Sequence, residues 1–458
     1  MNRITHILII FTIALSVVNA QHSYLDQYVV EALQSNIALQ QKQLSYQKSL
    51  AALKEAKGNY FPSLSLNARF SFAQGGRTID FPIGDLMNPV YNNLNLLNDV
   101  SEASIPDYPT IPEYPAVENQ SVNFLRTTEQ ETFVRVAMPI FNSAIMHGHR
   151  IRENLAEAEQ ISVEVYKKEL VKEVKIGYFN FAKAKEAVLI FESTLDLVKE
   201  NLRTTQSLHR NNKVTIDQVY AAEAEVKSIE QQLADAQKNE KVAKAYFNFL
   251  LNKDYDAEIQ LLTEEQLPKT AIAVGQARNQ AFQQRAEFQQ LNYAIAASDQ
   301  NVKLSKSNFL PELALAVDYG VQGVNYNLDK DADYMLGSVL MNWNLFDWTT
   351  KAKTQQAQIE KEELFKRKEA TKQQIGLQVV SAFYALEAAT KSIDLAKAEE
   401  DAAQKAFKLV QKKYSQGQAN LVEWTNARTQ MTTAEQRQNI AKYEYQICLA
   451  EFERAMGE

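Results

Sequence analysis

The chain has 458 residues and a formal net charge of −7 that is spread over both signs, so no basic face for a nucleic acid partner is expected. The single cysteine, Cys448, excludes a disulfide framework. Because Cys448 lies beside Tyr445 and Phe452 on an apolar helix seam, we predict a buried small side chain rather than a redox group.

The first twenty residues have the layout of a secretory signal peptide, with Arg3, an apolar run from Ile7 to Val18, and Val-Asn-Ala ending at Ala20. We expect cleavage near Ala20. Residue 21 is glutamine rather than cysteine, so no N-terminal lipid anchor is expected. No later stretch approaches the roughly 20 apolar residues of a membrane-spanning helix. Any membrane segment of the mature chain is therefore expected to consist of strands.

Two segments of the first half, residues 63–74 and 129–140, alternate apolar and polar residues with the period of two that is typical of a strand. The first segment follows Pro62, which ends the helix before it. Each run is about ten residues, long enough to cross a bilayer as a tilted strand. The alternating apolar residues are Leu64, Leu66, Ala68, Phe70 and Phe72 in the first strand and Val134, Val136, Met138 and Ile140 in the second.

Residues 75–127, between these strands, hold six of the ten prolines of the chain. This density of turn residues predicts an irregular, locally acidic loop rather than a domain with its own core. Residues 108–115 also suit a polyproline recognition strip, although a surface loop without a ligand is the favoured interpretation.

Residues 142–251 carry two coiled-coil seams, in which apolar residues recur at alternating spacings of three and four. The first seam runs from Phe181 to Leu202, and the second runs from Val219 to Ala236 after a short polar break. Two such seams joined by a break predict a long helical hairpin.

The second half of the chain repeats the first, because residues 141–250 align without a gap to residues 346–455, 205 positions later. The first repeat therefore covers residues 21–255 and comprises a helix, a strand, the loop, a strand and the hairpin. After an inter-repeat linker at 256–270, the second repeat covers residues 271–458. It is predicted to contain a helix, a strand at 311–321, a loop at 322–333, a strand at 334–346 and a helical hairpin at 348–456.

Four strands cannot close a barrel. An open sheet edge is not tolerated in lipid because its backbone groups would lose their hydrogen bonds to water. The edges must therefore pair with other copies of the chain. Two copies give eight strands, three give twelve and four give sixteen. The number of strands per chain does not determine which of these forms.

No catalytic constellation is apparent in the sequence, which contains no Gly-rich phosphate loop, no nucleophile elbow and no spacing typical of metal ligands. His147 and His149 lack the further ligands that a metal site needs. We therefore expect neither an enzyme nor a bound cofactor or metal.

Four segments carry a family resemblance: the opening helix at residues 31–39, the strand junction at 59–66, the matching junction at 308–315, and the turn at 414–421. Together they resemble the TolC-like outer-membrane efflux protein family, the exit ducts of tripartite pumps and type I secretion systems. The resemblance extends over essentially the whole mature chain, in order and in both repeats. It implies a mixed α and β membrane protein, a homotrimer whose twelve strands form one transmembrane β-barrel. A long α-helical coiled-coil barrel would continue it into the periplasm.

The resemblance also implies a location and partners. A chain of this family spans the outer membrane, contacts its lipid and extends into the periplasm, with the strand turns at 75–127 and 322–333 outside the cell. Its hairpin tips point toward the inner membrane. The implied partners are a periplasmic adaptor, or membrane fusion protein, and an inner-membrane pump that is proton-driven or of the ABC type. The alternative is a secreted periplasmic scaffold of coiled coils, whose four strands pair in a soluble sheet.

By position in the family, the two hairpin tips are predicted to dock the adaptor, and residues just beyond them are predicted to form the gate. Two positions depart from the family pattern. Asn212 replaces a tip glycine, which a left-handed turn still tolerates, and Asn426 replaces the second gate acid. An acidic residue near a helix start also interacts with the helix dipole, so a simpler interpretation of Glu423 stays open. The docking residues are Asn212, Lys213, Val214, Thr215, Ile216, Gly417, Gln418, Ala419, Asn420, Leu421 and Val422, and the gate residues are Asp217, Glu423 and Asn426.

Overall fold

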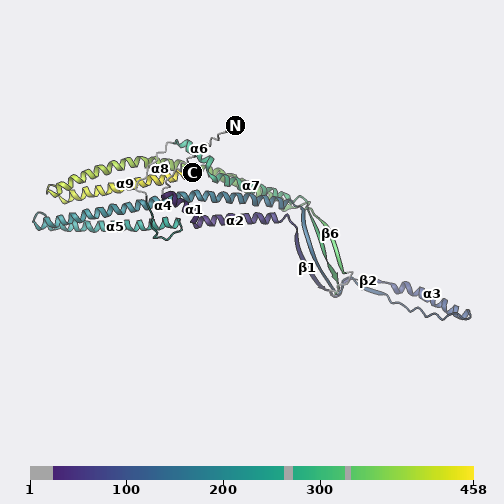
Figure 1. Ribbon diagram of the computed structural model, residues 1–458. Helices are drawn as coiled ribbons and strands as arrows, with labels where there is room; N and C mark the ends of the chain where they lie inside the picture. Colours follow the sequence, from purple (N-terminus) through teal and green to yellow (C-terminus); the bar gives the residue numbers. More distant parts are fainter. Residues whose placement is uncertain (1–23, 262–271, 325–331) are drawn as a thin grey trace, which may run out of the picture. The chain divides into compact units, whose positions relative to one another are not determined.

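The computed structural model describes residues 24–261, 272–324 and 332–458 (Figure 1). The predicted signal peptide lies outside the described residues, as do most of the predicted linker at 256–270 and part of the predicted turn at 322–333. The chain divides into two compact units. The helical unit contains the described residues up to 53 together with 150–302 and 354–458, and the strand unit contains residues 54–149 and 303–353.

Long helices dominate the chain, and the mixed α and β character predicted from the sequence is confirmed. Helices α4 and α8 have 68 residues each, and each is followed by a shorter helix that runs back along it, which makes one hairpin per repeat (Figure 1). Within the described ranges, no helix combines the length and the apolar composition needed to cross a bilayer. The helices are α1 (Tyr24–Ser35), α2 (Ile37–Gly58), α4 (Ser143–Arg210), α5 (Ile216–Leu250), α6 (Val274–Gln284), α7 (Ala286–Ser307), α8 (Trp348–Ser415) and α9 (Leu421–Met456).

Equivalent residues of the two repeats form equivalent apolar cores. Val174 of α4 and Val379 of α8, which are 205 positions apart, are both fully buried. The same is true of Phe247 on α5 and Phe452 on α9. Cys448 lies in the second core, and burial, followed by the nearby charges of Glu444 and Glu451, raises the pKa of its thiol to about 11. The predicted buried small side chain is therefore confirmed.

A charged cluster ties the short helices of the second repeat to both hairpins. Arg285, between α6 and α7, donates to the two carboxylate oxygens of Glu287 at 2.8 and 2.9 Å. Arg454 of α9 donates to Glu287 at 2.8 Å and to Glu169 of α4 at 3.1 Å. Burial alone raises the pKa of Glu287, but the hydrogen bonds from Arg285 and Arg454 outweigh burial and hold the pKa at about 2.

The four-stranded antiparallel sheet of the strand unit has the order β1-β4-β5-β6. Within the described residues, β1 and β6 each pair on one side only, so both are edge strands. The strand predicted at 334–346 is shorter than expected, because Trp343 leaves the ladder and donates its indole N–H to the carbonyl of Phe309 at 3.0 Å. The strands are β1 (Ser63–Phe72), β4 (Thr128–Phe141), β5 (Glu312–Gly323) and β6 (Asp333–Asn342).

The two faces of this sheet differ in polarity. One face carries ion pairs between residues in direct register, with Arg69 paired to Glu131 at 3.2 Å and Arg135 paired to Asp318 at 2.7 Å. The opposite face is apolar and uncovered in the single chain, as expected of a surface that meets a different solvent. Its exposed residues include Leu64, Leu66, Phe70, Phe72, Val134, Val136, Met138, Leu315, Tyr319, Met335, Val339 and Met341.

Residues 75–127, predicted to be an irregular loop, instead contain regular elements, and this corrects the sequence analysis. Strand β2 (Thr78–Phe81) pairs with β3 (Gln120–Asn123), and the 22-residue helix α3 (Ile83–Ser104) follows β2. The prolines led to a wrong prediction because most of them lie outside the helix, at its two ends. Pro82 stands just before the first helical residue, where the absence of an N–H costs nothing, and four others follow the helix end. Only Pro89 lies inside α3.

Asparagine side chains hold residues 105–119 against α3. Asn88 donates to the carbonyl of Val117 at 2.9 Å and accepts from its N–H at 2.8 Å. Asn95 makes the same pair of hydrogen bonds with Tyr114, at 3.0 and 2.9 Å. A Cβ added to Gly84 would lie 2.3 Å from the carbonyl oxygen of Val117, so this position requires glycine. We call β2, α3, residues 105–119 and β3 the α3 insertion.

We predict that Glu287→Gln lowers the melting temperature at neutral pH and that the deficit disappears as the pH falls toward about 2. A carboxylate whose folded-state pKa is lowered stabilises the fold above its unfolded-state pKa, ~4.3, and loses that contribution as the pH falls through the folded-state value. Thermal unfolding, followed by circular dichroism from neutral to acidic pH, measures the deficit.

The matched control for this experiment is Glu164→Gln on α4, which removes an exposed ion pair with Lys167 at 2.7 Å. It should change the melting temperature little at any pH. A Glu287→Gln deficit that stays the same size from neutral to acidic pH would contradict the prediction.

Candidate functional site

The two hairpin tips have the same backbone geometry. Tip 1 is residues 211–215, between α4 and α5, and tip 2 is residues 416–420, between α8 and α9. Asn212 and Gly417, at equivalent positions, have left-handed φ angles of 56° and 75°. The N–H of the next residue then bonds to the carbonyl five residues earlier, at 2.9 Å in tip 1 and 2.8 Å in tip 2. Asn212 thus adopts the left-handed conformation predicted for it.

The start of α9 explains one of the predicted gate residues in local terms. The side-chain oxygen of Asn420 accepts from the backbone N–H of Glu423 at 2.8 Å, and its amide nitrogen donates to the Glu423 carboxylate at 3.2 Å. The first bond makes Asn420 the N-cap of α9 and satisfies one free backbone donor of the helix start, and the second bond holds the Glu423 side chain beside the cap. Glu423 therefore has a structural role that does not depend on gating. The equivalent Thr215 makes no such side-chain bond at the start of α5.

Most of the predicted docking residues are exposed at the tips. Val214 and Ala419 are half-buried. Leu421 is buried in the core between the hairpins, so it supports tip 2 from inside. The exposed docking residues are Asn212, Lys213, Thr215, Ile216, Gly417, Gln418, Asn420 and Val422.

The three predicted gate residues are all exposed and are distributed over both hairpins. Asp217 lies in the first turn of α5, and Glu423 lies in the first turn of α9. Asn426 follows Glu423 by three residues on the same helix, which places the two side chains on one helix face.

The structure adds polar contacts between the hairpins near the tips, which the sequence analysis missed. Tyr414 of α8 shares a hydrogen bond with Thr205 of α4, 3.0 Å between the two hydroxyl oxygens. Glu225 of α5 accepts from the hydroxyl of Thr425 at 3.0 Å and forms an ion pair with Arg428, both on α9. The side chains of Arg428 and Glu225 are only 7% and 11% exposed, so this pair is shielded from water.

Further along α9, the contacts pass to α4. Thr432 and Thr194 have their hydroxyl oxygens 3.1 Å apart, and Asn439 donates to the carbonyl of Lys183 at 2.9 Å. Apolar side chains fill the space between these polar contacts. The shared cluster contains Leu195, Val198, Val226 and Ile229 from the first hairpin and Phe407, Tyr414, Leu421, Trp424 and Met431 from the second.

A signal for this interface is present in the sequence of α4. The buried residues Thr194, Val198, Asn201 and Thr205 follow one another at spacings of four, three and four. They form a second coiled-coil seam beside the apolar one, which indicates that α4 contacts two helices at once. Because this seam is mostly polar, a search for apolar periodicity does not detect it.

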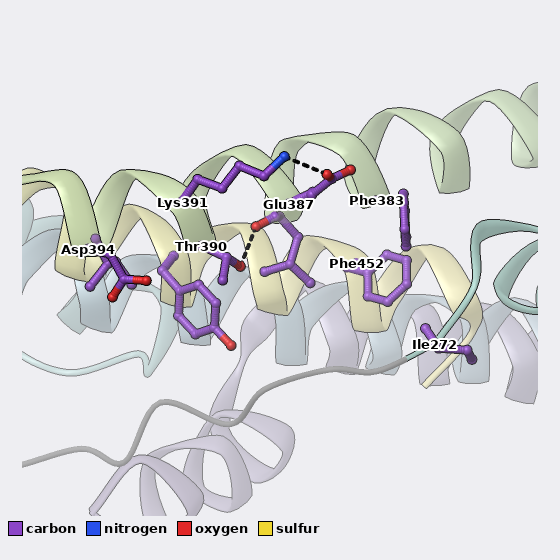
Figure 2. A pocket seen from close by; sticks show the side chains of 10 residues that line it. Ile272, Phe383, Glu387, Thr390, Lys391, Asp394 and Phe452 are labelled. Carbon is purple, nitrogen blue, oxygen red and sulfur yellow. Dashed lines mark hydrogen bonds and ion pairs between the residues drawn. The ribbon is translucent and has the colours of Figure 1, made fainter.

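A groove of about 340 Å³ lies between α8 and α9, beside the segment before α6 (Figure 2). Phe383, Phe452 and Ile272 give it an apolar lining. Three of its polar side chains are engaged, since Lys391 pairs with Glu387 at 2.7 Å and Thr390 donates to a backbone carbonyl of its own helix (Figure 2). The groove therefore suits apolar contact with protein better than recognition of a charged ligand.

Among the residues that the structure describes, no group of three histidine, cysteine, aspartate or glutamate residues is arranged to hold a metal ion. His149 instead contacts Tyr60 edge-to-face, with 5.8 Å between the ring centres.

Solved structures with the same fold cover nearly the whole chain. The outer membrane channel CmeC of Campylobacter jejuni matches 95% of this chain and 86% of its own, with a TM-score of 0.77 and 16% identity. VceC of Vibrio cholerae matches 95% and 97%, with a TM-score of 0.73 and 14% identity. The open state of the MtrE channel of Neisseria gonorrhoeae matches 95% and 89%, with a TM-score of 0.73 and 17% identity.

The chain therefore has the fold of bacterial outer-membrane channels. The sequence model of the outer membrane efflux protein family matches residues 277–458, which are most of the second repeat. This region belongs to that family, and the resemblance to TolC-like efflux proteins is confirmed. A comparison with curated proteins gives no match.

We predict that Glu225→Gln destabilises the hairpin interface by about 3 kcal/mol, because it leaves the buried guanidinium of Arg428 without a compensating charge. The double variant Glu225→Gln/Arg428→Met should recover most of this loss, since it removes both charges at once. A double-mutant cycle on thermal unfolding measures the coupling.

The control is Glu230→Gln on the same helix, which breaks an exposed pair with Lys227 at 2.8 Å. It should cost less than about 1 kcal/mol. A double variant no more stable than Glu225→Gln would show that the pair does not carry the effect.

Proposed function

We propose that this protein is the outer-membrane exit duct of a tripartite efflux pump or type I secretion system, a passive gated channel. The observation that carries the proposal is the sheet of the strand unit, which among the described residues has one uncovered apolar face and two unpaired edges. A soluble protein would bury such a face, whereas lipid is its natural solvent. The strands have 10, 14, 12 and 10 residues, compared with the ~9–11 that a tilted transmembrane strand needs.

The edges favour assembly from several copies. Unpaired N–H and C=O groups on β1 and β6 would each cost several kcal/mol in hydrocarbon. Pairing β1 of one copy with β6 of the next satisfies both rows. A homotrimer would close a barrel of twelve strands, as the resemblance to TolC-like efflux proteins implies.

In such a barrel the polar face of the sheet lines a water-filled lumen. Arg135 forms two hydrogen bonds of 2.7 Å with Asp318 on the neighbouring strand, and Tyr334 donates to Glu131 at 3.1 Å. Bidentate pairs of this kind hold neighbouring strands in register. The polar residues therefore fit a wall that faces water on one side and lipid on the other.

The helical hairpins provide the proposed contact with the rest of the machine. The exposed residues of both tips dock a periplasmic adaptor, and the energy for transport comes from an inner-membrane pump. Opening the periplasmic end separates the second hairpin from the first, which breaks the Tyr414 and Thr205 hydrogen bond and the Arg428 and Glu225 pair. Because these contacts are few and polar, they hold the closed arrangement without making it irreversible.

We expect the protein to fractionate with the outer membrane and to run as a trimer that dissociates on heating. A coiled-coil scaffold in the periplasm would instead be released by osmotic shock as a soluble species. Membrane fractionation, followed by native mass measurement in detergent, distinguishes the two. A water-soluble monomer in the absence of detergent would exclude the duct.

We also predict that Glu423→Gln lowers the cation preference of the closed channel, because it removes one negative charge per subunit from the narrow periplasmic mouth. Glutamine keeps an oxygen that can accept the hydrogen bond from Asn420, so the helix cap is retained. Asn426→Asp should shift selectivity in the opposite direction. Single-channel recording in planar bilayers measures both effects.

The control for these recordings is Glu230→Gln, an exposed charge change on α5 away from the tips. If Glu423→Gln leaves both the conductance and the cation preference of the wild type intact, Glu423 acts only as a helix cap.

A further inference from the structure

Helix α3 carries its polar residues on the covered side. The residues that face the return segment 105–119 are Gly84, Asn88, Tyr91, Asn95 and Asn98, at spacings of four, three, four and three. The side-chain amides of Asn88 and Asn95 form hydrogen bonds with the backbone of the return segment. Tyr91 stacks on Tyr114 with 5.3 Å between ring centres. A helix packed on a monomeric protein normally buries its apolar stripe. Helix α3 does the opposite, because its covered side is polar.

The opposite side of α3 is an apolar heptad stripe exposed to solvent. Leu86, Val90, Leu97 and Val100 recur at coiled-coil spacing, with Asn93 in the middle of the series. The four apolar side chains are between 49% and 69% exposed. The flanking positions are also uncharged, and they include Met87, Leu94, Leu96 and Ala103. An apolar face this wide matches a bundle of more than two helices better than a two-helix seam.

Charge argues against a lipid surface as the partner of this stripe. Residues 78–125 contain seven acidic residues and no lysine or arginine. Helices that lie on membranes carry basic residues beside their apolar face, because lipid surfaces are predominantly anionic. The α3 insertion has the opposite composition, so its uncharged stripe suits another uncharged stripe of the same kind.

Chain connectivity brings such stripes from different copies toward one another. The insertion leaves the sheet from β1, the edge strand, and returns through β4. The helices α2 and α4 join these strands at their other ends, so the insertion and the long helices are attached to opposite ends of the sheet. Copies related by rotation about a barrel axis present their α3 helices at the same end and parallel to each other.

We propose that the α3 helices of three copies pack through this stripe into a parallel three-helix bundle at the outer mouth of the duct. The inference rests on the proposed trimeric duct. Leu86, Val90, Leu97 and Val100 form its apolar layers, and Asn93 forms one polar layer that fixes the register. The partner of the apolar face is therefore a second and a third copy of this chain.

The experiment compares two single-cysteine variants in a Cys448→Ala background. Asn93→Cys places a thiol in the stripe, and Asn92→Cys places one on the neighbouring exposed asparagine, which points away from the bundle axis. Full-length protein in outer membranes is oxidised, and disulfide-linked species are separated by denaturing electrophoresis. Linked dimers are expected from Asn93→Cys and not from Asn92→Cys.

A second pair of variants tests the packing itself. Adding Leu97→Glu to Asn93→Cys should abolish the crosslink, because it places three carboxylates in one apolar layer. Adding Asn92→Glu to Asn93→Cys, the matched charge control, should leave the crosslink in place. Trimer mass in detergent without oxidant is measured for every variant.

The outcomes separate this inference from the proposed function. A trimer in which Asn93→Cys stays monomeric on denaturing gels, or crosslinks no more than Asn92→Cys, overturns the bundle and leaves the duct intact. A crosslink that survives Leu97→Glu also overturns it. Absence of a trimer in the unoxidised protein overturns the duct and the bundle together.

Discussion

Backbone hydrogen bonding at the edges of one four-stranded sheet constrains the rest of this structure. In the part of the single chain that the structure describes, β1 and β6 each offer a row of N–H and C=O groups without a strand beside it, and the face between them is apolar and uncovered. In water such an edge invites uncontrolled pairing, and in lipid it is too costly to leave open. Closure through identical neighbours would remove both problems, because each copy would supply the edge that the next one lacks.

The internal duplication also applies to the helices. Each repeat supplies two strands and one hairpin, and buried residues such as Phe247 and Phe452 occupy matching places in the two cores. The repeats differ where they meet each other. There, Tyr414 contacts Thr205, and Arg428 pairs with Glu225, so a largely apolar interface is divided by polar contacts. An interface of this type is specific and yet separable, as the proposed gate between the hairpins would require.

The α3 insertion departs from the duplication, since it interrupts only the first pair of strands. It is also the region where local composition led to a wrong prediction of secondary structure. The prolines suggested an irregular loop, yet Pro82 precedes a helix, and Asn88 of that helix bonds to a returning backbone segment. Both residue types are common in loops, and here they border a helix and hold it against the return segment 105–119. Which of these roles they take depends on whether another segment lies within hydrogen-bond reach, and a local pattern does not contain that information.

The amino-acid sequence alone determined the periodic features: the strand alternation, the apolar helix seams, the 205-residue repeat and the left-handed turn at Asn212. These follow from backbone geometry, because side chains repeat every two residues in a strand and about every 3.6 in a helix. Only the tertiary structure decided which polar residues meet. Glu225 and Arg428 lie 203 positions apart on separate hairpins, and Thr205 and Tyr414 lie 209 positions apart. Contacts of this kind depend on how helices are rotated and aligned against each other, and that alignment is set by packing over the whole length of the hairpins rather than by any short segment.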